Sequence, residues 1–247
     1  AIVIIDLNKD ILLISRDKFG EKPVFYYVDN NKIIIGSELK IFKHFKNVNL
    51  TANPISLKKY FIYSFIPAPQ TIYKNIYKVK HSENIKINLE NFSINKRIYF
   101  KPAIIKNNQF NESKFIDELD FLISESVKSR LLSDSKIGVF LSGGLDSSLI
   151  SFYAKKENAN LESYSISVNE KSFDEIENAK KMSKHLDIKL HDTKLDKEKF
   201  SSNFNRIIGL LDEPIGAPTY IPMYFLSELA SKNVKSVLSG DGADEIF

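Results

Sequence analysis

Two short strings in the second half of the chain combine glycine, serine and aspartate in a way that suits phosphate chemistry. The first is Ser142-Gly143-Gly144-Leu145-Asp146-Ser147-Ser148, and the second is Ser239-Gly240-Asp241-Gly242-Ala243-Asp244-Glu245. Glycine lets backbone amides approach an anion closely, and serine hydroxyls add hydrogen-bond donors. The carboxylates repel phosphate unless a cation lies between them, and Mg²⁺ prefers such hard oxygen ligands. The strings therefore predict a site for a phosphate compound with Mg²⁺ held between Asp146 and Asp241.

Each string follows an apolar run that suits a buried strand. Residues 137–141 precede the first string, residues 234–238 precede the second, and a helix is expected over 147–157. Ligands of open parallel sheets bind at the carboxyl ends of the strands, which is where both strings would lie. The alternatives are a plain strand-turn-helix corner for the first string and a solvated acidic turn for the second.

Two common nucleotide-binding motifs are excluded by the same residues. No lysine follows the paired glycines, so the first string is not a Walker A loop. The third spaced glycine of the dinucleotide fingerprint is also absent.

The elements around these strings alternate between helix and strand. This rhythm predicts an α/β domain with a doubly wound parallel sheet and helices on both faces. The expected helix over 112–132 carries an apolar face of Phe115, Leu119, Leu122, Ile123 and Val127. The other expected helices are 173–185, 196–211 and 221–232, and the other expected strands are 161–168 and 188–191.

The first hundred residues have a different pattern, because short β-branched and aromatic runs follow one another with few helices between them. They predict an antiparallel α+β layer with helices over 37–45 and from Pro54. Leu57 and Phe61 are expected to face a core, and core packing is the expected role of the aromatic set Phe61, Tyr63, Phe65 and Tyr73. Arg16 and Asp17 are adjacent and suit a surface ion pair. The polar residues 101–111 read as a linker.

Composition excludes several classes of protein. The 247 residues carry 35 Lys plus Arg against 31 Asp plus Glu, a net charge of +4 that implies neither nucleic-acid nor membrane binding. The absence of cysteine excludes disulfides, thiolate zinc sites and a thiol nucleophile within these residues. The four histidines have no metal-binding spacing. Ala1 opens an apolar run and Phe247 follows an acidic loop, so a fragment cut at both ends is expected.

The strings resemble the motifs of a known family. Residues 142–148 are similar to the SGGxDS pyrophosphate loop of ATP pyrophosphatases, and residues 239–245 resemble a second motif of asparagine synthetases and their relatives. Residues 212–214 and 221–224 match the stretch of that family between the two loops. Residues 16–26, with Ser37-Glu38-Leu39-Lys40, resemble the glutaminase domain of class II amidotransferases, and residues 65–73 resemble its junction with the next domain.

The resemblance implies a fold and an activity. It implies part of an N-terminal-nucleophile glutaminase domain over 1–100, a linker over 101–111, and part of a synthetase domain of the adenine nucleotide alpha hydrolase type over 112–247. The implied enzyme is a cytoplasmic ligase that adenylates aspartate with ATP and amidates it with glutamine-derived ammonia. It uses Mg²⁺, binds neither nucleic acid nor membrane, and leaves room for a homodimeric parent protein.

The resemblance also implies roles for individual residues. The pyrophosphate would be held by Ser142, Gly143, Gly144, Asp146, Ser147 and Ser148. Phe140 and Ile166 would contact the adenosine, while Ser239 and Gly240 would approach the α-phosphate and ribose. Asp146 and Asp241 would bind Mg²⁺, with Asp241 and Asp244 as the catalytic carboxylates.

Two departures limit what the resemblance implies. The family hydrolyses glutamine with an N-terminal cysteine, which these residues lack, so no glutaminase chemistry is expected of them. The family's basic residue for the adenylation step is expected beyond Phe247. A β-lactam synthetase or a peptide-cyclising relative, and a non-catalytic ATP-binding remnant, stay open as alternatives. A tRNA-modifying ATP pyrophosphatase is disfavoured by the mild charge and the glutaminase-like first half.

Overall fold

The computed structural model describes residues 1–103, 111–168, 175–244 and 246. The chain divides into two compact units. The first unit comprises Ala1–Lys106 together with Ile208–Ala217, and the second comprises Asn107–Ile207 and Pro218–Phe247. The first unit therefore includes a short segment that comes from late in the chain.

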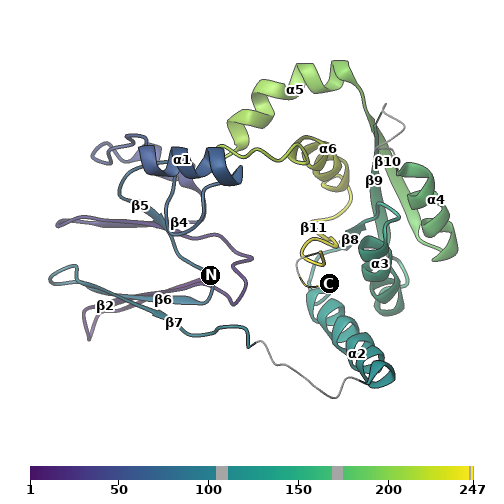
Figure 1. Ribbon diagram of the computed structural model, residues 1–247, viewed down its shortest axis with the longest axis horizontal. Helices are drawn as coiled ribbons and strands as arrows, with labels where there is room; N and C mark the ends of the chain where they lie inside the picture. The colour runs from purple at the N-terminus through teal and green to yellow at the C-terminus, as the bar shows by residue number, and fades with distance from the viewer. Residues whose placement is uncertain (104–110, 169–174, 245, 247) are drawn as a thin grey trace. The chain divides into compact units, whose positions relative to one another are not determined.

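Two antiparallel sheets form the first unit, as the sequence predicts (Figure 1). One sheet has the order β1-β2-β6-β7 and the other has the order β4-β3-β5. Their strands are β1 (Ile2–Asp6), β2 (Ile11–Ser15), β3 (Phe25–Val28), β4 (Ile33–Gly36), β5 (Ile76–Lys78), β6 (Glu83–Asn88) and β7 (Ile94–Ile98). The sequence pattern missed β5, since three residues are too few to show a period.

Strand β3 is the middle strand of its sheet, and both of its faces are apolar and buried. Tyr26 packs into one core with Ile14 and Ile85. Its neighbours Phe25 and Tyr27 point the opposite way, into a second core that includes the 3₁₀ helix η1 (Leu39–His44). The expected helix over 37–45 is thus a tighter 3₁₀ turn. Alternate side chains of one strand join the two cores.

Arg16 and Asp17 bind the backbone of the first unit and do not pair with each other, so the expected surface ion pair is wrong. The Arg16 guanidinium donates to the carbonyls of Gly20, Lys22 and Val79 at 2.6 to 3.0 Å. The Asp17 carboxylate accepts from the backbone N–H groups of Phe19, Glu21 and Lys22 at 2.8 to 3.2 Å. Backbone groups of the turn that joins β2 to β3, together with the carbonyl of Val79, hold the two side chains in place of a mutual salt bridge.

Asp17 is expected to make this unit sensitive to acid. Burial alone would raise its pKa, but the four backbone donors of residues 19–22 outweigh it and lower the pKa of Asp17 to about 2. A lowered pKa stabilises the fold above the unfolded value near 3.8, and this contribution disappears as the pH falls towards 2. Asp17→Asn should cost about 1 kcal/mol of unfolding free energy at pH 7, allowing for solvent screening, and almost nothing at pH 2. Urea unfolding followed by circular dichroism at both pH values measures the difference, and an equal cost at both would contradict it.

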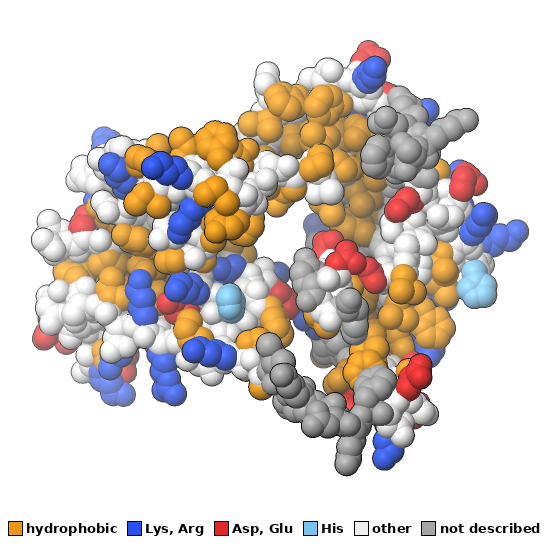
Figure 2. Space-filling model, in the orientation of Figure 1, with side chains coloured by type: hydrophobic (Ala, Val, Ile, Leu, Met, Phe, Trp, Pro, Cys, Tyr) orange, Lys and Arg blue, Asp and Glu red, His pale blue; other side chains and the backbone are white. Residues whose placement is uncertain are grey.

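Helix α1 (Pro54–Tyr63) does not bury the face that its sequence suggested. Phe61 is 77% exposed and Leu57 is 41% exposed, while Ser56 is fully buried. Tyr63 and Phe65 are exposed as well, so the core role expected for this aromatic set is wrong for three of its four members. Figure 2 shows hydrophobic side chains gathered on the surface over α1. Spacing identified the helix but not which of its faces packs inward.

The second unit is built on a parallel sheet. Its strands are β8 (Ile137–Phe140), β9 (Glu162–Val168), β10 (Lys189–Leu195) and β11 (Ser236–Leu238), and every pairing among them is parallel. Its helices are α2 (Glu112–Arg130), α3 (Leu145–Glu157), α4 (Ile176–His185), α5 (Lys197–Leu210) and α6 (Tyr220–Ala230). The expected helix start at residue 173 lies outside the described residues.

Helices cover both faces of this sheet (Figure 1). Val139 of β8 points towards α2 and α3, whereas the next residue, Phe140, points towards α6. Leu141 then faces α4 on the same side as Val139. Two residues of the face predicted for α2, Phe115 and Leu122, are about half exposed, which corrects the width of that face. None of the described helices is long and apolar enough to cross a membrane.

The strand order, β10-β9-β8-β11, decides where a ligand can bind. From β8 the chain adds β9 and β10 on one side, then returns to add β11 on the other side. The direction of winding therefore reverses between β8 and β11. In open parallel sheets this switch point leaves a crevice at the carboxyl ends of the strands.

Candidate active site

A cavity of about 880 Å³ lies at the switch point. Its walls come from the loop after β8, the carboxyl half of β9, the start of α6 and the loop after β11. Most of the residues singled out in the sequence line it, namely Phe140, Ser142, Gly144, Asp146, Ser147, Ile166, Ser239, Gly240, Asp241 and Asp244. The fold thus brings together two strings that are about 90 residues apart in the sequence.

The loop after β8 is held by its own serines. The Ser142 and Ser147 hydroxyls are 2.9 Å apart, and the Ser147 hydroxyl also accepts from the Ser142 N–H. The Gly144 N–H donates to the Ser142 hydroxyl at 3.2 Å. Helix α3 starts at Leu145, and helix geometry leaves the N–H groups of residues 145–147 without an intrahelical acceptor. Such a helix end favours an anion.

Gly143 is confined by helix α4. Its φ of +85° is a conformation that side chains rarely adopt, and a Cβ at this position would lie 2.4 Å from the carbonyl carbon of Asn178 and 2.5 Å from the nitrogen of Ala179. Gly143 does not line the cavity. This glycine therefore serves the close packing of the loop against α4, while Gly144 faces the cavity.

Ser148 also lies away from the cavity lining. It is 8% exposed, and among the described residues its hydroxyl has no hydrogen-bond partner. Contact between Ser148 and a phosphate stays a prediction.

The loop after β11 touches the loop after β8 through Gly240. A Cβ on Gly240 would lie 2.9 Å from the Cβ of Asp146 and 3.0 Å from the nitrogen of Ser147. Within the second loop, Ser239 donates its hydroxyl proton to the Asp241 carboxylate at 3.0 Å. Close contact at Gly240 thus holds Asp146 and Asp241 on neighbouring walls of one cavity. Glu245 of the same string lies outside the described residues.

The cavity lining carries an uneven charge. Asp146, Asp241, Asp244 and Glu175 contribute four carboxylates, and the described residues of the lining include no lysine, arginine or histidine. Such a lining repels a polyphosphate unless a cation accompanies it.

The donor set of this lining fits Mg²⁺. Carboxylate oxygens are the ligands it prefers, and Mg²⁺ is commonly held by one or two carboxylates together with substrate phosphates. Among the described residues, no three or more His, Cys, Asp or Glu side chains form a group that could hold a metal ion by themselves. Asp146 and Asp241, which lie on either side of the close contact at Gly240, remain the predicted pair of ligands.

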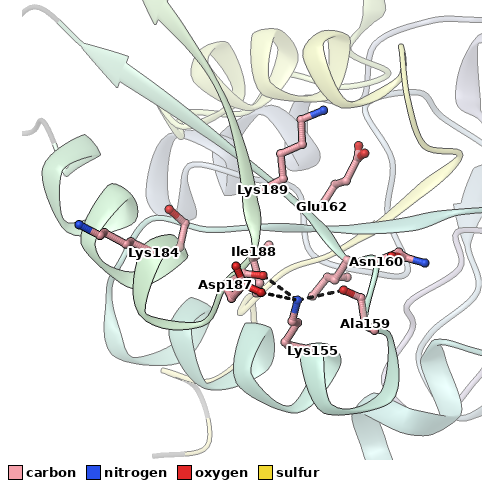
Figure 3. Close-up of a pocket in the computed structure, with 10 residues that line it drawn as sticks. Lys155, Ala159, Asn160, Glu162, Lys184, Asp187, Ile188 and Lys189 are labelled. Atoms are coloured by element: carbon pink, nitrogen blue, oxygen red, sulfur yellow. Dashed lines mark hydrogen bonds and ion pairs between the residues drawn. The ribbon is translucent and has the colours of Figure 1, made fainter.

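A second pocket, of about 510 Å³, lies at the amino ends of β9 and β10 (Figure 3). Lys155 donates there to the backbone carbonyls of Ala159 and Asp187, at 2.9 and 2.6 Å. Figure 3 shows Lys184 and Lys189 extending away from it. Lys155 therefore links the turns before β9 and β10, and its ammonium group already donates hydrogen bonds to both of them.

Comparison with known proteins bears on both units. A family model described as asparagine synthase matches residues 118–247, slightly more than half of the chain. The chain belongs to the asparagine synthase family. A second model, described as a glutamine amidotransferase domain, matches residues 1–100.

Two curated members of the asparagine synthase family align with the whole of this chain. The putative glutamine-hydrolyzing asparagine synthetase 2 of Methanocaldococcus jannaschii is 35% identical over 251 residues. The glutamine-hydrolyzing asparagine synthetase 1 of Bacillus subtilis is 32% identical over 247 residues. The chain spans 48% and 39% of their respective lengths. Among solved structures, the NH3-dependent NAD synthetase of Campylobacter jejuni is 15% identical, with a TM-score of 0.38, over 53% of this chain and 58% of that one.

The sequence did not predict the wall of the cavity that lies outside the two loops. That wall is apolar and comes mainly from the segment before α6 and its first turns, with Pro218, Thr219, Pro222, Met223 and Leu226. Residues 221–224 had matched a family motif, but apolar side chains that face a ligand have the same periodicity as side chains that face a core. The motif was the only signal that pointed to them.

Tyr164 also lines the cavity but does not serve as a base. Burial and its hydrogen bond to Glu162, at 3.0 Å, raise the pKa of Tyr164 to about 12, so the phenol stays protonated at pH 7. Its ring stacks on His191 at 5.1 Å, and His191 in turn lies 3.2 Å from Glu162. His191 is therefore packed against the ring and carboxylate of two neighbouring residues of β9.

Proposed function

We propose that this chain supplies the nucleotide site of a glutamine-dependent asparagine synthetase. An oxygen of the aspartate side-chain carboxylate attacks the α-phosphorus of ATP, the bond to the β-phosphate breaks, and pyrophosphate leaves. Ammonia then attacks the acyl carbon of the aspartyl-AMP, loses a proton, and displaces AMP to give asparagine. The supporting observation is the contact of the two loops at the switch point, around a cavity lined by carboxylates.

The proposed residue roles are those that the family resemblance implies, and the position of the residues in or behind the cavity lining supports them. The N–H groups at the start of α3, with the Ser142 and Ser147 hydroxyls, bind the β- and γ-phosphates that depart as pyrophosphate. Phe140 and Ile166 lie beside the adenosine, and Ser239 and Gly240 lie beside the α-phosphate and ribose. Asp244 supports the loop that carries Asp241. Gly143 and Ser148 complete the proposed pyrophosphate loop from positions behind the lining.

Asp146 and Asp241 would hold Mg²⁺ in this proposal. When bound, the ion neutralises phosphate oxygens and the charge that develops on the departing pyrophosphate. Ser239 orients Asp241 through its hydrogen bond, which fixes the direction of the carboxylate oxygens.

The assignment of domains along the chain is part of the same proposal. In this proposal residues 1–100 are part of an N-terminal-nucleophile glutaminase domain and residues 112–247 are part of an adenine nucleotide alpha hydrolase-like synthetase domain. The linker predicted over 101–111 lies mostly outside the described residues. The antiparallel sheets of the first unit and the parallel sheet of the second support this assignment. The 247 residues contain no cysteine, so glutamine hydrolysis is not assigned to them. A cytoplasmic location follows from the use of ATP and aspartate as substrates.

Pyrophosphate release by the full-length protein that carries this sequence should depend on aspartate. With Mg-ATP and ammonium, we expect pyrophosphate, AMP and asparagine in equal amounts, because one α-phosphorus is attacked for each amide formed. A coupled pyrophosphate assay, with chromatography of nucleotides and amino acids, measures all three. Glutamate is the matched control, since it differs by one methylene and should give no stimulation.

Other outcomes of this assay would contradict the proposal in distinct ways. Stimulation by a different carboxylate would assign the site to a relative such as a β-lactam synthetase or a peptide cyclase. Release of ADP and phosphate would place the attack on the γ-phosphorus. ATP binding without turnover under any condition would indicate a non-catalytic remnant.

A further inference from the structure

Two buried serines on one face of strand β9 differ in their hydrogen bonding. Ser163 is 0% exposed and Ser165 is 4% exposed. The Ser163 hydroxyl donates to the carbonyl of Lys189, on the neighbouring strand β10, at 3.1 Å. The Ser165 hydroxyl, by contrast, has no hydrogen-bond partner among the described residues. Buried hydroxyls are normally paired, so the unpaired hydroxyl of Ser165 calls for a partner from outside the protein.

The hydroxyl of Ser165 can be reached from the cavity at the switch point. Ser165 is part of the cavity lining, whereas Ser163 is not. Two other serine hydroxyls of the described residues, those of Ser56 and Ser148, are also unpaired, but both are sealed from solvent and the hydroxyl of Ser165 is not. A molecule in the cavity therefore has access to this hydroxyl.

Ser165 lies on the side of the sheet that carries the loop after β8. Its neighbours in sequence, Tyr164 and Ile166, pack with Phe140 in the core next to α6. Because side chains alternate along a strand, Ser165 faces the opposite side, where Leu141 packs against α4. The register that pairs Phe140 with Tyr164 also brings Leu141 beside Ser165, and Leu141 immediately precedes the loop. Ser165 thus lies next to the base of the proposed pyrophosphate loop.

The chemistry of the lining points to a phosphate oxygen as the partner. The described lining contains no lysine, arginine or histidine, so its contacts to phosphate oxygens have to come from neutral N–H and O–H donors. The Ser142 and Ser147 hydroxyls, 2.9 Å apart, already bond to each other. The Ser165 hydroxyl is a donor that no described residue uses. The adenosine is proposed to lie beside Phe140 and Ile166, whose side chains are on the other side of β9.

We propose that Ser165 is a further phosphate-binding residue, whose hydroxyl donates a hydrogen bond to an oxygen of the pyrophosphate part of ATP. The inference rests on the proposed function, since it takes the cavity to be the ATP site. It extends the phosphate contacts from the loop after β8 to the neighbouring strand β9. It also explains why two serines of one strand face, equally buried, differ in their hydrogen bonding.

Ser165→Ala in the full-length protein tests this inference. The substitution leaves no protein group unpaired, so the thermal midpoint of the ligand-free protein should not fall. The dissociation constant for Mg-ATP, measured by titration calorimetry at 25 °C, should rise about ten-fold, as expected for the loss of a hydrogen bond to a charged group. Ser165→Cys, whose thiol is only a weak donor, should raise it as well and carries the test if the alanine variant does not fold.

A comparison of ligands tests which part of the nucleotide the hydroxyl contacts. Ser165→Ala should weaken the binding of Mg-pyrophosphate about as much as that of Mg-ATP. The dissociation constant of adenosine, which has no phosphate, should stay within two-fold of wild type. A loss confined to adenosine would place the hydroxyl at the nucleoside and would overturn the assignment.

Ser163→Ala is the matched control. Ser163 lies on the same face of the same strand and is equally buried, but it does not line the cavity. Its loss leaves the carbonyl of Lys189 without this hydrogen bond, so the thermal midpoint should fall by about 3 °C. The dissociation constant for Mg-ATP should stay within two-fold of wild type.

The results that would count against these proposals can be told apart. An unchanged dissociation constant for Mg-ATP in both Ser165 variants would show that the hydroxyl binds only water, and would overturn this inference alone. An equal rise in Ser163→Ala would trace the effect to a general disturbance of β9 and would also overturn it. A wild-type protein that binds no Mg-ATP would overturn the proposed function, and this inference with it.

Discussion

Gly240→Ala should reduce aspartate-dependent pyrophosphate release by about 100-fold, the cost of displacing catalytic groups by about 1 Å. The added Cβ would lie 2.9 Å from the Cβ of Asp146 and 3.0 Å from the nitrogen of Ser147. The nitrogen is backbone at the start of α3 and cannot swing aside as a flexible side chain would. The two loops must therefore separate, which moves the proposed Mg²⁺ ligands apart and withdraws the α3 N–H groups from the phosphates.

The effect should lie in catalysis more than in folding. Gly240, unlike Gly143, has no positive φ, so the substitution adds a contact without backbone strain. Gly209→Ala is the control, because a Cβ there meets nothing within 4 Å and the residue lies in α5. That variant should keep full activity and gain up to about 1 kcal/mol of stability from helix propensity. Wild-type turnover in Gly240→Ala would show that the two loops do not act together.

Asp146→Asn should weaken the binding of Mg-ATP by about 100-fold, since it removes one of two carboxylates proposed to hold the ion. The lining has four carboxylates and, among its described residues, no cationic side chain that could neutralise the phosphates in place of the ion. The same substitution should improve the binding of metal-free ATP, because it removes a negative charge that repels the phosphates. Titration calorimetry with Mg-ATP, and with ATP in excess EDTA, measures both effects.

These opposite changes separate a metal ligand from a residue that only shapes the loop. A loop-shaping role would weaken both forms of ATP alike. Asp192→Asn is the control, because Asp192 is an exposed carboxylate of β10, at the edge of the same sheet. It should change the affinity for neither Mg-ATP nor metal-free ATP. Equal affinity of Asp146→Asn and wild type for Mg-ATP would refute the Mg²⁺ assignment.

Much of the fold follows from local sequence pattern, because a strand or helix reports its own periodicity. The apolar, β-branched run 11–15 is observed as strand β2, and the long helix expected over 112–132 ends at Arg130, two residues early. Periodicity was misleading on burial. Phe61 sits on a helix that the pattern located, yet it is exposed, because which side of a helix packs inward depends on the neighbours it meets.

The candidate site was recognisable for a different reason. Each half of the proposed site is one unbroken string of residues, so its Gly, Ser and Asp residues predict a phosphate site before any packing is known. The apolar wall of Pro218, Pro222 and Met223 carries no such chemistry, and it became visible only as part of a cavity.

The sequence by itself predicted phosphate chemistry for the two strings and located the strands that precede them. It also showed that these residues contain no thiol nucleophile. Tertiary structure alone decided that β11 returns beside β8, so that Gly240 meets Asp146. It also decided that Asp212 and Glu213 bind the first unit while the residues around them build the second. The physical reason is the separation in sequence of the groups that interact. The hydrogen bonds of a turn or a helix join residues a few positions apart, so local sequence predicts them. Strand order and the capping of η1 by Asp212 depend instead on which distant segments pack together and exclude water.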